Sequence, residues 1–225
     1  NTKFDENGVQ LIINPYDEWY SLVKAIVLKE KDPSILIHLI TVGGADTEPI
    51  IRKALALGGD EAIRVNNTSN DSMVVAQEIA AIAKEGAYDL ILTGKETIDY
   101  NSASIGSMLC ALLDTTFIPN AIALEVNGTT AIVKREIEGG EESCETSLPI
   151  ILSCQKGMAE QRIPNMRGIM AARTKPLKVV EASIHNATTS IKKFDTPPAK
   201  SGVKLVEAGN MDEMVRLLKE EAKVI

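Results

Sequence analysis

The hydrophobic residues of this chain fall into helical periods and short continuous runs that alternate through its first half. From Trp19 to Val27 they recur at three- and four-residue spacing, which predicts a helix with one buried face over residues 14–32. Asn14 is expected to cap this helix, because its side chain can accept a backbone hydrogen bond and Pro15 suits the first helical position.

Further elements follow in regular order. Strands are predicted at 34–42, 61–65 and 88–94, and helices at 47–59, 71–86 and 102–114. Asp71 is expected to cap the helix over 71–86. This alternation predicts an α/β fold with a doubly wound, mainly parallel sheet. The order begins with a helix, and residues 1–10 are too polar for a central strand, so a leading strand is expected from a segment upstream.

In the second half of the chain the helix–strand alternation gives way to successive strands. Between 119 and 154, β-favouring runs are joined by Asn127-Gly128 and Gly139-Gly140, which predicts an antiparallel β meander at the sheet edge. Residues 155–176 are expected to form a long loop or a loop with a helix, and loops of that length are usually functional. An extended arm and a C-terminal helix with an apolar stripe complete the chain, and they could pack on a partner or on their own domain.

Charge and composition narrow the function. The chain has 31 acidic and 24 basic residues, a net charge of −7, and no basic stripe, which argues against a nucleic-acid partner. The three cysteines and two histidines show no spacing typical of a metal site, and His38 is expected to be a sheet residue. No apolar run approaches the ~20 residues that span a membrane, so direct membrane insertion is not expected.

The stretch LILTGKETIDYNSASIG, residues 90–106, combines a strand, a glycine, a polar loop and a helix start. A helix amino terminus with free N–H groups attracts phosphate, and Thr97, Ser102 and Ser104 add hydroxyl donors. The stretch is neither a Walker A motif nor GxGxxG, so an ordinary strand–helix turn is the alternative. The glycines after the strand ending at Val42 could flank the same nucleotide.

Catalytic chemistry is not indicated. No His–carboxylate pair, GxSxG elbow or metal-ligand cluster occurs, and the acidic cluster around Glu136 is most simply a solvated turn. A nucleotide at this edge is therefore expected to be held rather than hydrolysed.

Four motifs together resemble one family. NPYDEWYSLVKA, LTGKETIDYNSASIG, VKREIEGGEE and EQRIPNMRGIMAARTKP occur in the order and at the spacing found in the beta subunit of electron-transfer flavoprotein. The resemblance extends over essentially the whole chain. It implies an adenine nucleotide alpha hydrolase-like fold, with a nucleotide-binding domain over 1–176 and an arm and helix over 177–225 that pack on the partner subunit.

The resemblance also implies a function. The beta subunit pairs with an alpha subunit that holds most of the FAD, and it buries an AMP as a structural nucleotide. The heterodimer carries electrons from flavin dehydrogenases of the acyl-CoA dehydrogenase type to a quinone reductase, and beta performs no bond chemistry of its own. A cytoplasmic location in a bacterium, or the mitochondrial matrix in a eukaryote, is expected.

The family's binding residues map onto positions of this sequence. The implied AMP-site residues are Asn14, Pro15, Tyr16, Asp17, Val42, Gly94, Lys95, Glu96, Thr97, Ile98, Asp99, Tyr100, Asn101, Ser102, Ala103, Ser104 and Ile105. Tyr16 is also expected to approach the flavin. The implied partner-binding residues are Glu136, toward the flavin domain of alpha, and Arg162, Met166, Ile169 and Met170 in the dehydrogenase-docking loop, with Met166 as the apolar anchor.

Two alternatives remain open. Some relatives bind a second FAD in place of AMP and bifurcate electrons, although Gly94-Lys95 and the residues after Asp99 are more similar to the AMP kind. A stand-alone nucleotide sensor of the universal-stress type would have a similar sheet, but its glycine loop is lacking. The family's leading strand, with the loop that follows it, is not found in these residues.

Overall fold

A computed structural model describes residues 5, 7–183, 185–200 and 202–225, which form two compact units. The larger unit, residues 6–190, is the α/β body. Its helices are α1 (Glu18–Lys31), α2 (Glu48–Leu57), α3 (Ser72–Gly86), α4 (Ile105–Leu113) and α5 (Met166–Ala172), with a 3₁₀ turn at Ala45–Thr47. Its strands are β1 (His38–Val42), β2 (Glu61–Asn66), β3 (Leu90–Gly94), β4 (Thr116–Asn127), β5 (Thr130–Ile137), β6 (Gly140–Ser147), β7 (Ile150–Cys154) and β8 (Leu177–Glu181).

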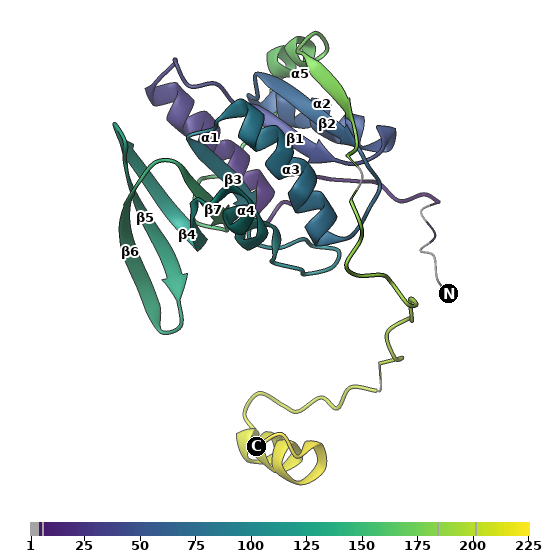
Figure 1. Cartoon of the computed structure of the whole chain (residues 1–225). Helices are drawn as coiled ribbons and strands as arrows, with labels where there is room; N and C mark the ends of the chain where they lie inside the picture. The colour runs from purple at the N-terminus through teal and green to yellow at the C-terminus, as the bar shows by residue number, and fades with distance from the viewer. Residues whose placement is uncertain (1–4, 6, 184, 201) are drawn as a thin grey trace. The chain divides into compact units, whose positions relative to one another are not determined.

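The strands form two sheets. One has the order β1-β2-β8 with all pairs parallel, and the other has the order β3-β7-β4-β5-β6. In the second sheet β3, β7 and β4 are parallel, and β4, β5 and β6 are antiparallel (Figure 1). Helices cover both faces, since α1 packs beside β3 and β7, while α3 and α4 pack together beside β1 and β7. The predicted doubly wound α/β architecture is confirmed.

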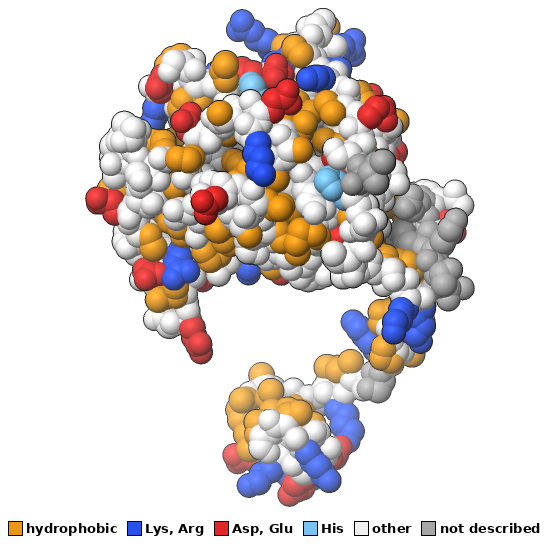
Figure 2. All heavy atoms as spheres, viewed as in Figure 1, with side chains coloured by type: hydrophobic (Ala, Val, Ile, Leu, Met, Phe, Trp, Pro, Cys, Tyr) orange, Lys and Arg blue, Asp and Glu red, His pale blue; other side chains and the backbone are white. Residues whose placement is uncertain are grey.

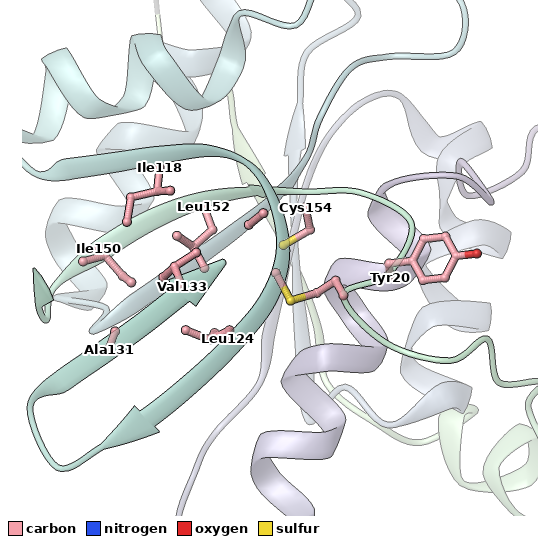
Figure 3. Close-up of a cluster of buried hydrophobic side chains, with 10 residues drawn as sticks. Tyr20, Ile118, Leu124, Ala131, Val133, Ile150, Leu152 and Cys154 are labelled. Carbon is pink, nitrogen blue, oxygen red and sulfur yellow. The ribbon is translucent and has the colours of Figure 1, made fainter. Parts of the chain in front are cut away.

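The main core lies where the meander meets α1. Its buried side chains include Ile118, Leu124, Val133 and Leu152 from neighbouring strands, and Tyr20 reaches it from α1 (Figure 3). Burial of such side chains stabilises the fold by about 1.5–3 kcal/mol each. This core therefore holds in place the strands whose carboxyl ends form the site described in the next subsection.

The residues of β7 correct one prediction. Ile150 to Cys154 are all buried, so they do not alternate as an edge strand of a meander would. The structure inserts β7 between β3 and β4, parallel to both. The two predicted hairpins are confirmed, at Asn127–Thr130 and at Ile137–Gly140.

The helix boundaries show which capping signals operate. Asp71 caps α3 as predicted, because its carboxylate accepts the Val74 N–H at 3.0 Å. The predicted cap at Asn14 is wrong: α1 begins at Glu18, and the Asn14 Oδ1 atom accepts the Tyr16 N–H inside a preceding turn. Asn14 contributes to tertiary structure instead, as shown below.

The second unit contains the arm from residue 191 and a short helix. The helix α6 (Met211–Arg216) is capped by Asn210, whose side chain accepts the Glu213 N–H, and a π-helical stretch continues it over Leu217–Ala222. Hydrophobic side chains gather on one side of this unit (Figure 2). Met211 and Met214 of α6 are exposed. None of the helices among the described residues combines the length and apolarity that a membrane crossing requires.

Candidate functional site

Two segments far apart in the sequence meet at the carboxyl end of β3. The Asn14 Nδ2 atom donates to the Glu96 carbonyl at 3.1 Å, and the Glu96 N–H donates to the Asp17 carboxylate at 3.0 Å. One turn into α1, the Ser21 hydroxyl donates to the Thr93 carbonyl at 2.7 Å. Asn14 and Asp17 are both buried, so these bonds are shielded from water. The turn before α1 and the start of the 95–104 loop therefore form one braced unit.

The 95–104 loop has a defined backbone. Lys95 donates its N–H to the Cys154 carbonyl of β7, and Asn101 donates its N–H to the Thr97 carbonyl at 2.8 Å. Asn101 and Ala103 both have left-handed backbones, with φ of 51° and 47°. For a residue other than glycine this conformation is uncommon and is maintained by its surroundings.

The loop delivers the chain to the amino terminus of α4. The first backbone N–H groups, of Ile105, Gly106 and Ser107, have no acceptor within the helix by the geometry of any α-helix, and the N-cap residue Ser104 makes no side-chain cap bond. Gly106 lets α4 pack closely on the sheet, since a Cβ there would lie 2.4 Å from the Phe117 ring. Free amides and the positive end of the helix dipole together favour an anion at this position.

A cavity of about 330 Å³ lies beside this edge. Its loop part is lined by residues 94–97 and 102–105, and its sheet part by residues of β1, β3 and α3. Eight of the predicted nucleotide residues thus line one cavity. Asn14 and Asp17 lie behind the loop as braces, whereas Val42 and residues 98–101 are not among the lining residues, and Ile98 and Tyr100 are exposed.

Glu18 is a member of this site that the sequence analysis missed. Its carboxylate faces the cavity beside Gly94, where an added Cβ would lie 2.6 Å from the Glu18 Cδ atom. Its Oε2 atom is buried and has no hydrogen-bond partner among the described residues. Burial raises the pKa of Glu18 to about 7, with a smaller contribution from Asp17 in the same direction. In sequence, a glutamate in the first turn of a helix indicates only a favourable dipole contact.

The predicted docking loop is anchored on α1. The Arg162 guanidinium donates to both carboxylate oxygens of Glu30, at 2.5 and 2.9 Å, and the Trp19 indole N–H donates to the Arg162 carbonyl at 3.0 Å. The Gln161 side chain donates to the Pro15 carbonyl. These anchors fix the backbone without using the apolar side chains of the loop. None of the three anchoring roles was anticipated from the sequence.

The helix α5 presents those apolar side chains to solvent. Its backbone lies against α2, since a Cβ at Gly168 would come within 2.3 Å of the Ala56 carbonyl oxygen. The exposed fractions are 73% for Met166, 56% for Met170 and 41% for Ile169, and Ile163, in the loop just before α5, is 89% exposed. An apolar group held outward on a fixed backbone is a feature of interaction surfaces rather than of cores.

The remaining predicted contact, Glu136, lies near the end of β5 and is exposed. Its carboxylate accepts a hydrogen bond of 2.5 Å from the amide of Gln155, a buried residue directly after β7. Gln155 therefore orients Glu136, a relation between strands that no local sequence signal reveals.

Comparisons with known proteins agree with this architecture. A family model described as "Electron transfer flavoprotein domain" matches residues 1–185. The chain is 38% identical to the electron transfer flavoprotein subunit beta of Bacillus subtilis, across 99% of this chain and 91% of that protein, and 32% identical to the subunit of the same name from Bradyrhizobium diazoefficiens, across 99% and 92%. It is also 29% identical to the "Caffeyl-CoA reductase-Etf complex subunit CarD" of Acetobacterium woodii, across 96% of this chain and 87% of that protein.

Proposed function

The chain belongs to the electron transfer flavoprotein family as a beta subunit, and from this membership we propose a division of labour within a heterodimer. The alpha subunit holds most of the FAD, and this chain holds AMP as a structural nucleotide. The heterodimer takes electrons from flavin dehydrogenases of the acyl-CoA dehydrogenase type and passes them to a quinone reductase. When bound, the flavin supplies the redox chemistry, and this chain supplies the nucleotide seat and the protein contacts. We place the complex in the bacterial cytoplasm or, in a eukaryote, in the mitochondrial matrix.

The braced carboxyl edge is the observation that carries the AMP proposal. The Asn14–Asp17 turn fixes the strand end at Glu96, and the loop then returns to the free amides at the start of α4. A monophosphate fits this donor set, because backbone amides and the hydroxyls of Thr97, Ser102 and Ser104 supply hydrogen bonds. No general base or metal-ligand group is needed for a nucleotide that only holds the loop in place.

The electrostatics also orient the nucleotide. Glu18 lies at the Gly94 end of the cavity, and a carboxylate disfavours a neighbouring phosphate. The phosphate is therefore assigned to the Ser102–Ile105 end, which lies at the helix amino terminus. Exposed Tyr16 on the preceding turn is available to the flavin side of the partner.

Two surfaces support the partner contacts. The fixed, outward apolar side chains around Met166 suit a docking site for dehydrogenases, since a flexible thioether adapts to several apolar pockets. In the second unit, Val203 and Leu205 are 83% and 93% exposed, and α6 adds an apolar stripe. We assign the arm and helix to contact with the alpha subunit, and Glu136, oriented by Gln155, to its flavin domain.

One comparison favours a second candidate function. The relative from Acetobacterium woodii is named as a subunit of a caffeyl-CoA reductase complex, so a beta subunit of this kind can belong to an enzyme assembly. In the bifurcating version of the proposal, a second FAD takes the place of AMP at the same loop. Gly94-Lys95 and the residues after Asp99, which are more similar to the AMP kind, favour the smaller nucleotide.

The test is the nucleotide content of the heterodimer. The chain is copurified with its alpha subunit and denatured, and the released nucleotides are identified by chromatography and mass spectrometry. One AMP and one FAD per heterodimer is the expected result. Two FAD molecules would support bifurcation, and ATP released from a homodimer would support the nucleotide-sensor alternative and overturn the carrier proposal.

A further inference from the structure

Two basic residues, Arg173 and Lys175, follow α5 at the end of the docking loop, and their side chains are used differently. Arg173 is exposed, whereas Lys175 is half-buried and turns toward α2. Its Nζ atom donates to the Leu55 carbonyl at 2.9 Å and to the Gly59 carbonyl at 2.5 Å, at the carboxyl end of α2. A cation at this position is favoured by the helix dipole and by the unpaired carbonyls of the last turn. Lys175 therefore caps α2, although its place in the sequence suggests a contact with a partner.

Arg52 of α2 makes the converse contact with the end of α5. Its Nη1 atom donates to the Ala172 carbonyl at 2.9 Å and to the Lys175 carbonyl at 2.6 Å. Ala172 is the last residue of α5, so its carbonyl has no donor within the helix. Each helix thus receives the cation that caps its carboxyl end from the other segment. We call Arg52 and Lys175 together the reciprocal clamp.

The helix α5 depends on such external contacts. It has seven residues, and a helix of that length is not stable alone in water. Of these seven described residues only Ala172 is buried, and it packs with Leu55 in one apolar cluster. Asn165 caps the amino end by accepting the Gly168 N–H at 2.8 Å. The position of α5 is therefore set by its contacts with α2, which lies beside it (Figure 1).

The residue after Arg52 supports the other end of the docking loop. The Lys53 Nζ atom lies 5.2 Å from the centroid of the Trp19 ring, and the Trp19 indole N–H holds the Arg162 carbonyl. Lys53 is exposed, so this cation–π contact is the weaker of the two supports. Consecutive residues of α2 thus act on both ends of the segment that carries the apolar side chains, and Arg52 acts directly.

Asp60 balances the charge of the clamp. Its carboxylate accepts hydrogen bonds from Lys29 Nζ at 2.6 Å and from the Ile37 N–H at 2.7 Å. Burial lowers the pKa of Lys175, and the charge of Asp60 opposes this effect. Replacing Lys175 therefore changes the end of α2 as well as the clamp. Arg52 is the more selective position for a test, because both of its hydrogen bonds to backbone carbonyls go to the end of the docking loop.

We propose that Arg52 is a positioning residue for dehydrogenase docking. By holding the last turn of α5 against α2, it keeps Met166, Ile169 and Met170 in the single arrangement that the apolar pocket of a partner accepts. Lys175 is the counterpart of Arg52 in this role and is not itself a contact for the partner. When the clamp is broken, only a fraction of the molecules present the competent arrangement, and the apparent affinity falls by that fraction. The inference rests on the proposed docking role of α5 and extends it to a residue 120 positions earlier in the chain.

The experiment compares variants of this chain, each copurified with the alpha subunit. Arg52→Met removes the clamp, Arg52→Lys keeps the charge, and Lys175→Met removes the other half. Lys84→Met, at an exposed position near the end of α3, controls for the loss of a positive charge. KM and kcat are measured for electron acceptance from an acyl-CoA dehydrogenase reduced by its acyl-CoA substrate. Hydrogen exchange of residues 162–176 reports the order of the docking loop, and FAD content reports the integrity of the heterodimer.

Arg52→Met should raise KM about tenfold and leave kcat within about twofold of the native value, because the complex, once formed, is unchanged. Exchange in 162–176 should be faster and FAD content unchanged. Arg52→Lys should recover most of the loss, Lys175→Met should show the same division between KM and kcat, and Lys84→Met should resemble the native chain. In a Met166→Glu background, Arg52→Met should have little further effect on KM, since the anchor that it positions is already lost.

Two results would overturn the role of Arg52. One is an unchanged KM for Arg52→Met despite faster exchange in 162–176, because the position of α5 would then not matter for docking. The other is a fall in kcat together with FAD content, because Arg52 would then serve the heterodimer as a whole. A native heterodimer that accepts no electrons from the dehydrogenase would instead refute the proposed function itself, so the two failures are distinguishable.

Discussion

Two loops leave neighbouring parallel strands of one sheet and present opposite chemistry. β3 and β7 pair in parallel with Gly94 opposite Cys154, so the 95–104 loop and the predicted docking loop, which follows β7, start at the same edge. The first turns backbone amides and hydroxyls toward a cavity, and the second turns Met166 and its neighbours out to solvent. The edge of the sheet therefore does not determine what a loop presents.

The same helix holds both loops. The turn before α1 supplies Asn14 and Asp17 to the 95–104 loop, while Trp19 and Glu30 anchor the docking loop at Arg162. One element thus sets the position of the proposed nucleotide site relative to the proposed docking surface. The predictions below ask whether the two loops can be changed independently.

The largest effect is expected from Glu18, which lies under the first loop. Its folded-state pKa of about 7 exceeds the usual value of 4.5, so the folded chain binds the proton more tightly than the unfolded chain does. The stability that this tighter proton binding gives the folded chain is fully present below about pH 4.5 and is lost as the pH rises through about 7. Glu18→Gln should therefore gain up to about 3 kcal/mol in free energy of unfolding over the native chain at pH 8, and little at pH 4.

Urea unfolding at a series of pH values checks this prediction. Glu85→Gln is the matched control, because Glu85 is exposed near the end of α3. A pH-independent difference between the Glu18 variant and the native chain would show that the carboxylate is not titrating in a buried site.

The next effect concerns the second loop. Met166→Glu places a charge on the proposed apolar anchor and should lower kcat/KM for electron acceptance from an acyl-CoA dehydrogenase about thirtyfold, the size typical of an interface hot spot. AMP and FAD contents should be unchanged, since Met166 is 73% exposed and lies outside the cavity lining. Leu36→Glu, at a 70% exposed position before β1, is the control. Unaltered kinetics with Met166→Glu would place docking elsewhere.

The local signals of this sequence predicted its elements well. The Asp71 cap, the Asn127-Gly128 hairpin and the continuous apolar runs each report on neighbours within a few residues, and the structure confirms them. The apolar run at 34–42 was predicted as one strand, but the strand begins only at His38. An apolar run does not indicate at which residue strand pairing begins. Asn14 shows a second limit of local signals. Its residue type favours helix capping, but its side chain instead donates to the Glu96 carbonyl, 82 positions away in the chain.

Contacts between residues far apart in the chain could not be predicted from the sequence. The insertion of β7 between β3 and β4 depends on pairing across more than 30 residues, and a buried apolar run is compatible with several sheet orders. Motif resemblance predicted a role for each of the two loops, but it gave no indication of the side chains that hold the loops in place. Trp19, Glu30 and Gln155 act through long-range hydrogen bonds, and Glu18 is unusual only because the fold buries it.

A smaller effect is expected when the brace of the first loop is removed. Asp17→Ala deletes the acceptor of the Glu96 N–H, a charge-assisted bond at a buried position, and should weaken AMP binding about tenfold, equivalent to about 1.4 kcal/mol. Calorimetric titration of AMP into nucleotide-depleted heterodimer measures this loss. Asp32→Ala, which removes an exposed turn bond to Ser34, serves as control. If dehydrogenase kinetics change as much as AMP affinity, the two loops are coupled.

The smallest effect tests the brace of the second loop. Glu30→Gln weakens the paired hydrogen bonds from Arg162, and because both side chains are about half exposed, the KM for the dehydrogenase should rise at most about fivefold while kcat stays constant. Trp19→Phe should act in the same direction by freeing the Arg162 carbonyl. The exchanged pair, Glu30→Arg with Arg162→Glu, should recover part of the loss, which a general change in folding would not allow. If Glu30→Gln instead lowered AMP retention with the KM unchanged, α1 would transmit strain from one loop to the other, and the view of two loops independently mounted on one helix would fail.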